Sequence, residues 1–514
     1  MASAATTSSP SHTSTDSDHN TAPVHAEVQR DHSDVGAAAP LSQGGGPQKS
    51  TPYNGKEEAS SSSNAEGDAR NDLPIIPEEQ RYFSIFDKQI ASERKAFLKP
   101  LLFFFALTTI ILWCVLPIFW GSTLLQEYYF PRLHIDVVDF DSIASGSSAL
   151  VGPRVSAILA SITAASGPHL TYEIVDPTTK YPGGYEQVME AVRHSGPWGA
   201  VVIFGNATTA WTDAVQNGVT TYDPTGSVGI YFAGARFYQI VLLFLSSLLS
   251  ENVHDGVYAA SQAATAQFLC GNTNAAAVTT AAPAALGTAF SFFQYDVSPI
   301  TAWASAAPME AGLIYVTIFT FHFALVTFFG RMFSGLNNRL KLLSLIKLRL
   351  LAVTVMYFFL SLWYTCLNAA FQEPLYDHVG RAGFVVFWAL NFVTLFALGL
   401  AMESMISLVT IKFFPFFLIF WIITNLTASF LPIDIMQPFY RWGYAFPFYQ
   451  NVQATKIILY GILPNHFLGQ YFGVLFAWSG VNLVFLPFCM WVERRRFEKG
   501  KEKERREKEG QKGE

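Results

Sequence analysis

The apolar residues of this chain gather in six long blocks, one near residues 98–120 and five between 311 and 492. A helix needs roughly 20 mostly apolar residues to cross about 30 Å of hydrocarbon. The pattern therefore predicts six transmembrane helices, at 98–120, 311–330, 349–368, 382–402, 413–431 and 470–492. The run 237–249 is also apolar, but its length favours a helix in a protein core over a seventh crossing.

The segment between the first two blocks, residues 121–308, alternates short apolar runs with amphipathic stretches. Runs rich in β-branched and aromatic residues predict four strands, at 133–140, 170–175, 198–204 and 228–233, the last of these being the final strand. Helical spacing predicts helices at 151–164, at 185–195 and over 234–269. A further short helix follows the strand 198–204 and ends at about Gln216. Residues 271–308 are rich in Ala, Thr and Pro, so we expect a linker or a loosely packed arm there.

Together these patterns predict a polytopic α-helical membrane protein with six transmembrane helices in a 1+5 arrangement. An extracytoplasmic α/β domain, residues 121–308, is inserted between helices 1 and 2, because strands that alternate with helices form a small wound sheet. A five-helix transmembrane block follows over 311–492. Prolines interrupt the apolar stretch before its last helix, which predicts an external re-entrant segment at 432–468.

The two ends of the chain differ from these blocks in composition. Residues 1–76 are rich in Ser, Thr, Ala, Gly and Pro, so they predict a disordered cytosolic tail. Apolar residues recur at helical spacing over 77–97, which predicts an amphipathic helix on the membrane surface, with a plain linker as the alternative. The charged cytosolic tail, 493–514, mixes Glu with Lys and Arg, which is typical of a solvated helix and not of a nucleic-acid-binding segment.

Composition and charge agree with a membrane protein and set its orientation. The chain is 51% hydrophobic and only 14% charged, which is too few charges for an ordinary soluble protein. The loop 331–349 carries five basic residues and no acid, and Arg494, Arg495 and Arg496 follow the last helix. With six crossings, these residues all fall on one side, so the positive-inside rule places both termini in the cytosol. The sequon at Asn206 then lies on the outer side, as a glycosylation site requires.

Sequence motifs for catalysis or cofactor binding are missing. The chain contains no Walker A loop, no HExxH or GxSxG motif and no clustered His and Cys, and its four cysteines occur singly. We therefore expect no enzyme activity, no catalytic residues, no metal and no cofactor. ATP-driven transport would need a separate nucleotide-binding subunit.

Three ionisable residues stand within or beside the predicted helices, where charge is costly and often functional. His322 lies near the middle of the second helix, where it binds a proton or a polar headgroup, or simply bonds a neighbouring helix. Glu403 ends the fourth helix and Lys412 begins the fifth. We expect these two to form an ion pair at the cytosolic interface or to gate a cytosolic opening.

The re-entrant segment holds the main candidate site for a substrate. Arg441 stands among aromatic residues, next to Trp442 and close to Tyr444. A cation among aromatic rings at the outer leaflet suits a phosphate headgroup or an amphipathic drug. The alternative is an aromatic belt that only anchors the protein at the membrane interface.

Several stretches of the sequence carry a resemblance to a known family. They are VVDFDS (137–142) with Gly146, VG (151–152), SGPWGAVVIFGNATTAW (195–211), YFAGARFYQ (231–239) and PIDIMQPFYRWGYAFPFYQNVQATKIILYG (432–461). In these stretches the chain resembles the fungal nitrosoguanidine-resistance membrane proteins over about residues 80–514. That family is similar to bacterial Pip/YhgE-like proteins and, more distantly, to type-2 ABC transporter permeases. Asp139, Asp141 and Arg236 mark these motifs, and the two aspartates follow a strand, where such residues usually cap a turn or helix.

The resemblance implies a permease-like plasma-membrane protein with a role in drug resistance and membrane lipid asymmetry. We expect it to transport or redistribute an amphipathic substrate, either a drug or a phospholipid. The alternative is a non-transporting regulator or scaffold of lipid asymmetry or the stress response. Membrane lipids are the expected partners, and no nucleic acid is expected. A homodimer is left as an open alternative.

Overall fold

The computed structural model describes residues 85–271 and 282–510. The predicted disordered tail, 1–76, lies outside the described residues, as does part of the predicted interfacial helix at 77–97. The described part of that segment forms a short 3-10 turn, Lys88–Ile90, and the first turns of helix α1, Ala91–Thr123. It therefore continues directly into the first apolar helix.

The α/β domain is built on one five-stranded sheet in the order β2-β1-β3-β4-β5. β1 runs parallel to β2 and β3, β4 is antiparallel to β3, and β5 runs parallel to β4. The strands are β1 His134–Asp139, β2 Thr171–Val175, β3 Gly199–Ile203, β4 Val228–Phe232 and β5 Phe292–Asp296. The four predicted strands are confirmed.

Strand β5 corrects the prediction for residues 271–308, which we expected to contain only a linker or a loose arm. Phe292–Asp296 pairs with β4 at the edge of the sheet. Its aromatic residues favour a strand, and the ring of Phe293 stacks on that of Phe204, 5.9 Å away. The strand was missed because it lies at the edge of the sheet, within a stretch whose overall composition is rich in Ala, Thr and Pro.

Helices cover both faces of this sheet. α3 and α8 pack on each other and share a hydrophobic cluster with Ile135, Val137 and Val201 of the strands. α5 packs on the other face with Val138 and Val202, as the alternation of side chains along a strand requires. The helices of the domain are α2 Asp141–Ser145, α3 Gly152–Thr163, α4 Pro177–Lys180, α5 Tyr185–Arg193, α6 Ala207–Asn217, α7 Tyr238–Ile240, α8 Ser246–Gly271 and α10 Pro283–Gly287.

Six helical stretches of the described chain are long and apolar enough to cross a membrane, so this is a polytopic helical membrane protein. The first precedes the α/β sheet, the second belongs to the α/β domain, and the other four follow it. The stretches are Lys88–Thr123, Tyr238–Gly271, Ala307–Phe333, Leu342–Ala370, Gly380–Val409 and Asn465–Glu509. The separate helices of the block are α11 Gly312–Phe333, α12 Leu336–Arg339, α13 Leu342–Ala370, α14 Gly383–Val409, α15 Phe414–Phe430, α16 Pro447–Tyr460 and α17 Leu468–Gly510.

The predicted span 413–431 is a short helix in the structure, and the apolar run 237–249 lies in the long helix expected over 234–269. α15 occupies the predicted span 413–431 but has only 17 residues, or about 25 Å of helix. It packs against α1, where the rings of Phe104 and Phe416 lie 5.0 Å apart. The apolar run 237–249 belongs to the longer stretch Tyr238–Gly271, and its residues Val241 and Leu245 are buried in the core of the α/β domain.

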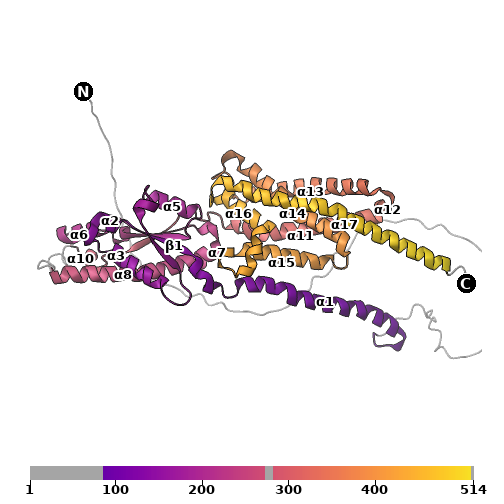
Figure 1. Cartoon of the computed structure of the whole chain (residues 1–514), viewed down its shortest axis with the longest axis horizontal. Helices are drawn as coiled ribbons and strands as arrows, with labels where there is room; N and C mark the ends of the chain where they lie inside the picture. Colours follow the sequence, from indigo (N-terminus) through magenta and orange to yellow (C-terminus); the bar gives the residue numbers. More distant parts are fainter. Residues whose placement is uncertain (1–84, 272–281, 511–514) are drawn as a thin grey trace, which may run out of the picture. The chain divides into compact units, whose positions relative to one another are not determined.

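Helices α13, α14 and α17 run side by side in the block (Figure 1). α13 and α14 pack closely at Gly399, where an added Cβ would lie 2.0 Å from Oη of the fully buried Tyr357. A larger residue at 399 would therefore push the two helices apart. This close packing holds the start of α13 against the end of α14, where the buried Arg349 and Glu403 lie.

The α/β domain and the helix block share hydrophobic cores. One cluster contains Val138 and Val202 from the sheet together with Leu390 of α14 and Ile457 of α16. Helix α16 lies within the predicted re-entrant segment, and 13 of its 14 residues are buried. Irregular backbone near membrane depth is tolerated where protein surrounds it, and α16 meets this condition. The hydrophobic core of the inserted domain therefore continues into the block.

Candidate functional site

A buried ion pair joins helices α13 and α14. Nη2 of Arg349 lies 2.5 Å from Oε2 of Glu403, and Nε of Arg349 lies 2.9 Å from the same oxygen. Arg349 is 2% exposed and Glu403 is fully buried. A guanidinium that donates two hydrogen bonds to one carboxylate is among the strongest polar contacts in proteins.

Neighbouring groups satisfy the rest of this pair. Nη1 of Arg349 donates to Oγ of Ser407 at 2.7 Å, and Nη2 donates to the backbone oxygen of Glu403 at 2.6 Å. Oγ1 of Thr327, on α11, donates to Oε1 of Glu403 at 2.9 Å. Three helices therefore contribute to one polar network, and such a network is favourable only when its members are satisfied.

Two further charged residues surround the pair more loosely. Oε2 of Glu493, on α17, lies 3.8 Å from Nη1 of Arg349. Arg331, on α11, is buried and is attracted electrostatically to Glu403 and Glu493. No hydrogen bond links its guanidinium to another described residue. We call these four residues, Arg331, Arg349, Glu403 and Glu493, the charge cluster, and it contains two cations and two anions.

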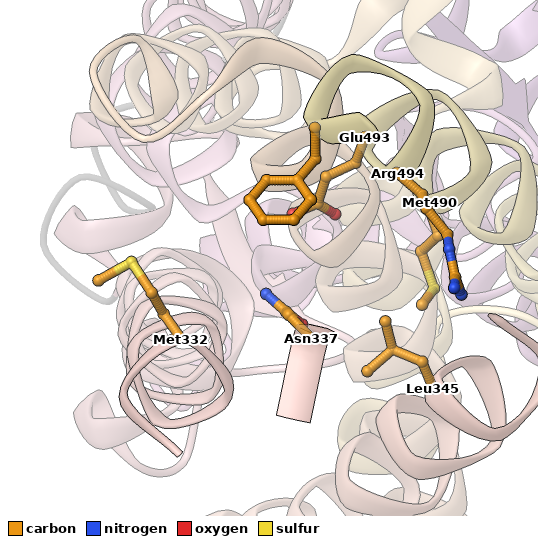
Figure 2. Close-up of a pocket in the computed structure, with 7 residues that line it drawn as sticks. Met332, Asn337, Leu345, Met490, Glu493 and Arg494 are labelled. Atoms are coloured by element: carbon orange, nitrogen blue, oxygen red, sulfur yellow. The ribbon is translucent and has the colours of Figure 1, made fainter. Parts of the chain in front are cut away.

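A cavity of about 140 Å³ lies beside the charge cluster. Figure 2 shows Glu493, Arg494 and Met490 of α17 on one side, facing Met332 of α11, Asn337 of α12 and Leu345 of α13. Phe497 completes the lining. The wall is mostly apolar, and Glu493 belongs both to the cavity and to the charge cluster.

Arg441 lies in a separate groove of about 530 Å³, formed by the α/β domain and the segment before α16. Tyr444 and Asp434 line the same groove, and Oη of Tyr444 donates to Oδ1 of Asp434 at 2.9 Å. Burial raises the pKa of the Tyr444 phenol, and the charge of Asp434 adds to the rise. Arg441 is exposed and makes no hydrogen bond or ion pair with any described residue, so its guanidinium is free for a ligand.

Arg132 fixes one wall of this groove. Its Nη1 donates to the backbone oxygens of Asp434 and Met436, at 3.0 Å each. Arg236 lies behind Trp198, with its guanidinium carbon 3.8 Å from the ring centroid and its Nη1 2.8 Å from the oxygen of Pro197. Burial lowers the pKa of Arg236 to about 10, so it stays charged at neutral pH.

The structure does not bring all the predicted site residues together. Trp442 is half-buried and packs on Phe446, with ring centroids 4.7 Å apart, so it supports the groove segment without lining the groove. His322 is exposed on α11, and its Nδ1 lies 2.8 Å from the backbone oxygen of Ile318 in the same helix. No contact among the described residues links His322 to Arg441.

The predicted ion pair between Glu403 and Lys412 is wrong. Glu403 pairs with Arg349, while Lys412 is exposed and makes no ion pair within the described ranges. Arg349 belongs to the basic segment 331–349 that we expected to be a loop, but it lies inside α13. One signal could have found it: Leu345, Arg349, Val353 and Tyr357 follow one another at intervals of four and form one buried helix face.

The two aspartates of the 137–142 motif cap helices, as predicted. Oδ2 of Asp141 accepts hydrogen bonds from the backbone nitrogens of Val151 and Gly152 and from Oγ1 of Thr208. Oδ1 of Asp139 accepts from the backbone nitrogen of Ser142 at 2.9 Å. Asn206 is exposed just before α6, where a glycan has room.

A buried amine was also missed. Lys456 of α16 is 4% exposed, and its Nζ has no hydrogen-bond partner within the described part of the chain. Nζ lies 3.2 Å from the ring centroid of Phe237. In the described ranges no group of three or more His, Cys, Asp or Glu residues is placed to bind a metal ion.

Comparison with known proteins places the chain in a family. The model of a family of proteins of unknown function, DUF3533, matches residues 104–484. The chain belongs to the DUF3533 family. The matched range begins within α1, includes the α/β domain and ends within α17, so it contains the groove and three members of the charge cluster, Arg331, Arg349 and Glu403. Glu493 lies beyond the matched range.

This DUF3533 protein is also similar to a yeast protein. An uncharacterized endoplasmic reticulum membrane protein of Saccharomyces cerevisiae, YJR015W, is 29% identical to it over 203 residues. The alignment spans 39% of this chain and 39% of the relative. The comparison with solved structures gave no match. The comparisons therefore give a multi-pass membrane protein of a family whose function is unknown.

Proposed function

We propose that this DUF3533 protein is a permease-like membrane protein that transports or redistributes an amphipathic substrate, either a drug or a phospholipid. The observation that carries the proposal is the charge cluster beside a cavity in the helix block. Ionisable side chains among apolar helices are costly and usually mark a path for a substrate or an ion. Here the cost is incurred by four charged side chains from four helices.

The groove at Arg441 supports the same function. Trp478 of α17 donates from Nε1 to the backbone oxygen of Ala445, 2.6 Å away, beside the groove residue Tyr444. Met490 at the cavity follows Trp478 by 12 positions, or about 18 Å of helix. The cavity and the groove are thus well separated along the direction of α17. The outer groove offers a free guanidinium to a phosphate or another anionic headgroup.

The remaining expectations belong to this proposal. The termini face the cytosol, the α/β domain lies outside or in a lumen, and the glycan at Asn206 lies with it. The protein acts without catalysis, with lipids as partners and a separate nucleotide-binding subunit only if transport is driven by ATP. A homodimer is compatible with this role. The plasma membrane is the proposed location, and the endoplasmic reticulum, which the relative's name gives, is the alternative.

The resemblance to nitrosoguanidine-resistance proteins supports resistance to xenobiotics as the biological outcome. Removal of an amphipathic drug from one leaflet, or a change in the lipids of that leaflet, would lower the amount of drug that enters. Both outcomes need the same groove and charge cluster.

The alternative function is that of a non-transporting regulator or scaffold of lipid asymmetry. The hydrophobic cluster shared by Val138 and Val202 of the sheet with Leu390 and Ile457 of the block favours it. Because the domain packs firmly on the helices, a conformational change caused by an external partner can be transmitted to the membrane helices.

A cell assay separates the two functions. Cells that make Arg441→Ala, Lys412→Ala or the unchanged chain are compared for growth in an amphipathic drug and for transfer of a fluorescent phospholipid between leaflets. We expect Arg441→Ala to reduce both and Lys412→Ala to change neither, with immunoblots confirming equal amounts of protein. Full transfer activity in Arg441→Ala would remove the groove from the proposal. Resistance without any transfer would favour the regulator.

A further inference from the structure

The cavity beside the charge cluster has uncommitted acceptors. Glu493 makes no hydrogen bond with another described residue, and its nearest charged partner is Nη1 of Arg349 at 3.8 Å. The side-chain amide of Asn337 also has no hydrogen bond among the described residues. Arg494, in contrast, is committed twice, to Glu498 at 3.3 Å and to the backbone oxygen of Leu340 at 3.2 Å. The polar capacity left for a ligand is therefore that of a carboxylate and an amide.

Arg349 does not need Glu493. Its nitrogens already donate to Glu403 and Ser407 at 2.5–2.9 Å. Glu493 can therefore turn its carboxylate to a ligand without leaving the Arg349 guanidinium unpaired. Because Arg331 and Arg349 share the field of Glu493, a cationic ligand competes with two fixed cations, and we expect its affinity to be modest.

The size and walls of the cavity define the other half of the ligand. A dry cavity of about 150 Å³ lined by apolar side chains can hold benzene, and this cavity measures about 140 Å³. Met332, Leu345, Met490 and Phe497 supply its apolar surface. Methionine side chains adapt to ligands of different shape and contact aromatic rings favourably. One ring or a short alkyl chain fits this space.

We propose that this cavity binds an amphipathic organic amine, with the ammonium at the Glu493 carboxylate and the apolar part among Met332, Leu345 and Phe497. The proposal rests on the proposed function only for the amphipathic class of the substrate, and it adds the positive charge. The cavity would therefore prefer cationic ligands, whereas the Arg441 groove, where the free group is a cation, would prefer anionic ones.

Three small probes of one shape test the preference. Benzylammonium, benzyl alcohol and benzoate are titrated onto the full chain in lipid nanodiscs, with saturation-transfer NMR as the readout and empty nanodiscs as the blank for partition into lipid. We expect benzylammonium to bind at least about tenfold more tightly than benzyl alcohol, equivalent to about 1.4 kcal/mol, and benzoate to bind least.

Matched variants assign the effect to the cavity. Glu493→Gln should bring benzylammonium and benzyl alcohol to equal affinity. Glu504→Gln, the same change about three helical turns later on an exposed residue, should leave the preference intact. Leu345→Trp should weaken all three probes by filling the cavity, and Met490→Trp does the same if the first variant fails to fold.

The outcomes are separable from those of the proposed function. Benzoate bound as tightly as benzylammonium, or an unchanged preference in Glu493→Gln, overturns the inference even if the protein transports lipid. Normal binding of benzylammonium in a protein that moves no amphipath leaves the inference standing and overturns the proposed function.

Discussion

Glu403 has no exposure to solvent and depends on Arg349 for its charge partner. Replacement of Arg349 by Leu leaves a buried carboxylate unpaired, which typically costs about 3–5 kcal/mol. We therefore expect Arg349→Leu to lower the free energy of unfolding by about that amount, measured by denaturant unfolding of the purified protein in detergent.

The double variant provides the control for this prediction. Arg349→Leu with Glu403→Leu removes both charges, so it should recover most of the stability lost in the single variant. Lys412→Leu, which touches no acidic partner, should change stability by less than about 0.5 kcal/mol. If the single and double variants are equally unstable, the loss of stability does not come from an unpaired Glu403 carboxylate.

Lys456 presents the opposite situation, because its buried amine has no acceptor. A polar group buried without a hydrogen bond costs about 1–3 kcal/mol, whereas contact with the Phe237 ring returns about 0.5–2 kcal/mol. We expect Lys456→Met, which keeps the length of the side chain, to raise the thermal midpoint of the purified protein. Lys456→Arg places a larger, permanently charged group there and should lower the thermal midpoint. A lower midpoint in Lys456→Met would mean that the ammonium stabilises the fold.

At this scale the sequence predicted local roles better than distant partners. The capping roles of Asp139 and Asp141 follow from residues a few positions away, so a local pattern indicates them. The partner of Glu403 lies 54 positions earlier in the chain, and only the packing of α13 on α14 brings it close. Hydropathy assigned Arg349 to a loop because an arginine ends an apolar window.

Among the elements, helices α2, α3 and α6 depend on one side chain. Asp141 is fully buried and accepts from Val151, Gly152 and Thr208. Hydrogen bonds to a charged group are worth about 1.5–3 kcal/mol, so we expect Asp141→Ala to destabilise the α/β domain by at least that much. Hydrogen exchange should quicken first at the amides of Val151 and Gly152.

Asp176 is the matched control for this element. It caps the short helix α4 through Thr178, but it is solvent-exposed. Asp176→Ala should cause a smaller loss, confined to α4. Equal effects of Asp141→Ala and Asp176→Ala would contradict the central position of Asp141 in the domain.

Element prediction succeeded where an apolar run stood out from its flanking sequence and failed where it did not. β1 to β4 are apolar runs bounded by turns, and all four were predicted. β5, Phe292–Asp296, is no shorter than β2 to β4, but it is an edge strand in an Ala-, Thr- and Pro-rich stretch, and its pairing with β4 depends on a contact across 60 positions or more. The length of the stretch that contains α8 exceeded the apolar run because packing on the sheet, and not hydropathy, sustains its later turns.

For the whole molecule, the order of apolar blocks predicted the architecture but not its coupling. A 1+5 pattern suggests a domain tethered to a bundle. The structure instead gives a hydrophobic cluster that runs from the sheet to α14 and α16. The sequence of α16 predicted irregular backbone because Pro447 and several polar residues precede the apolar end of the helix. Burial on all sides explains why this helix is stable at 14 residues.

The most direct test of the account measures movement of amphipathic molecules in vesicles that contain only the purified chain. We expect a fluorescent phospholipid or an amphipathic amine to cross between leaflets faster than in protein-free vesicles. Glu403→Gln should slow this movement at least about tenfold, because it removes the carboxylate that pairs with Arg349 in the charge cluster. Lys412→Gln should leave the movement unchanged. Movement no faster than in protein-free vesicles, with or without ATP and a proton gradient, would contradict transport by this protein.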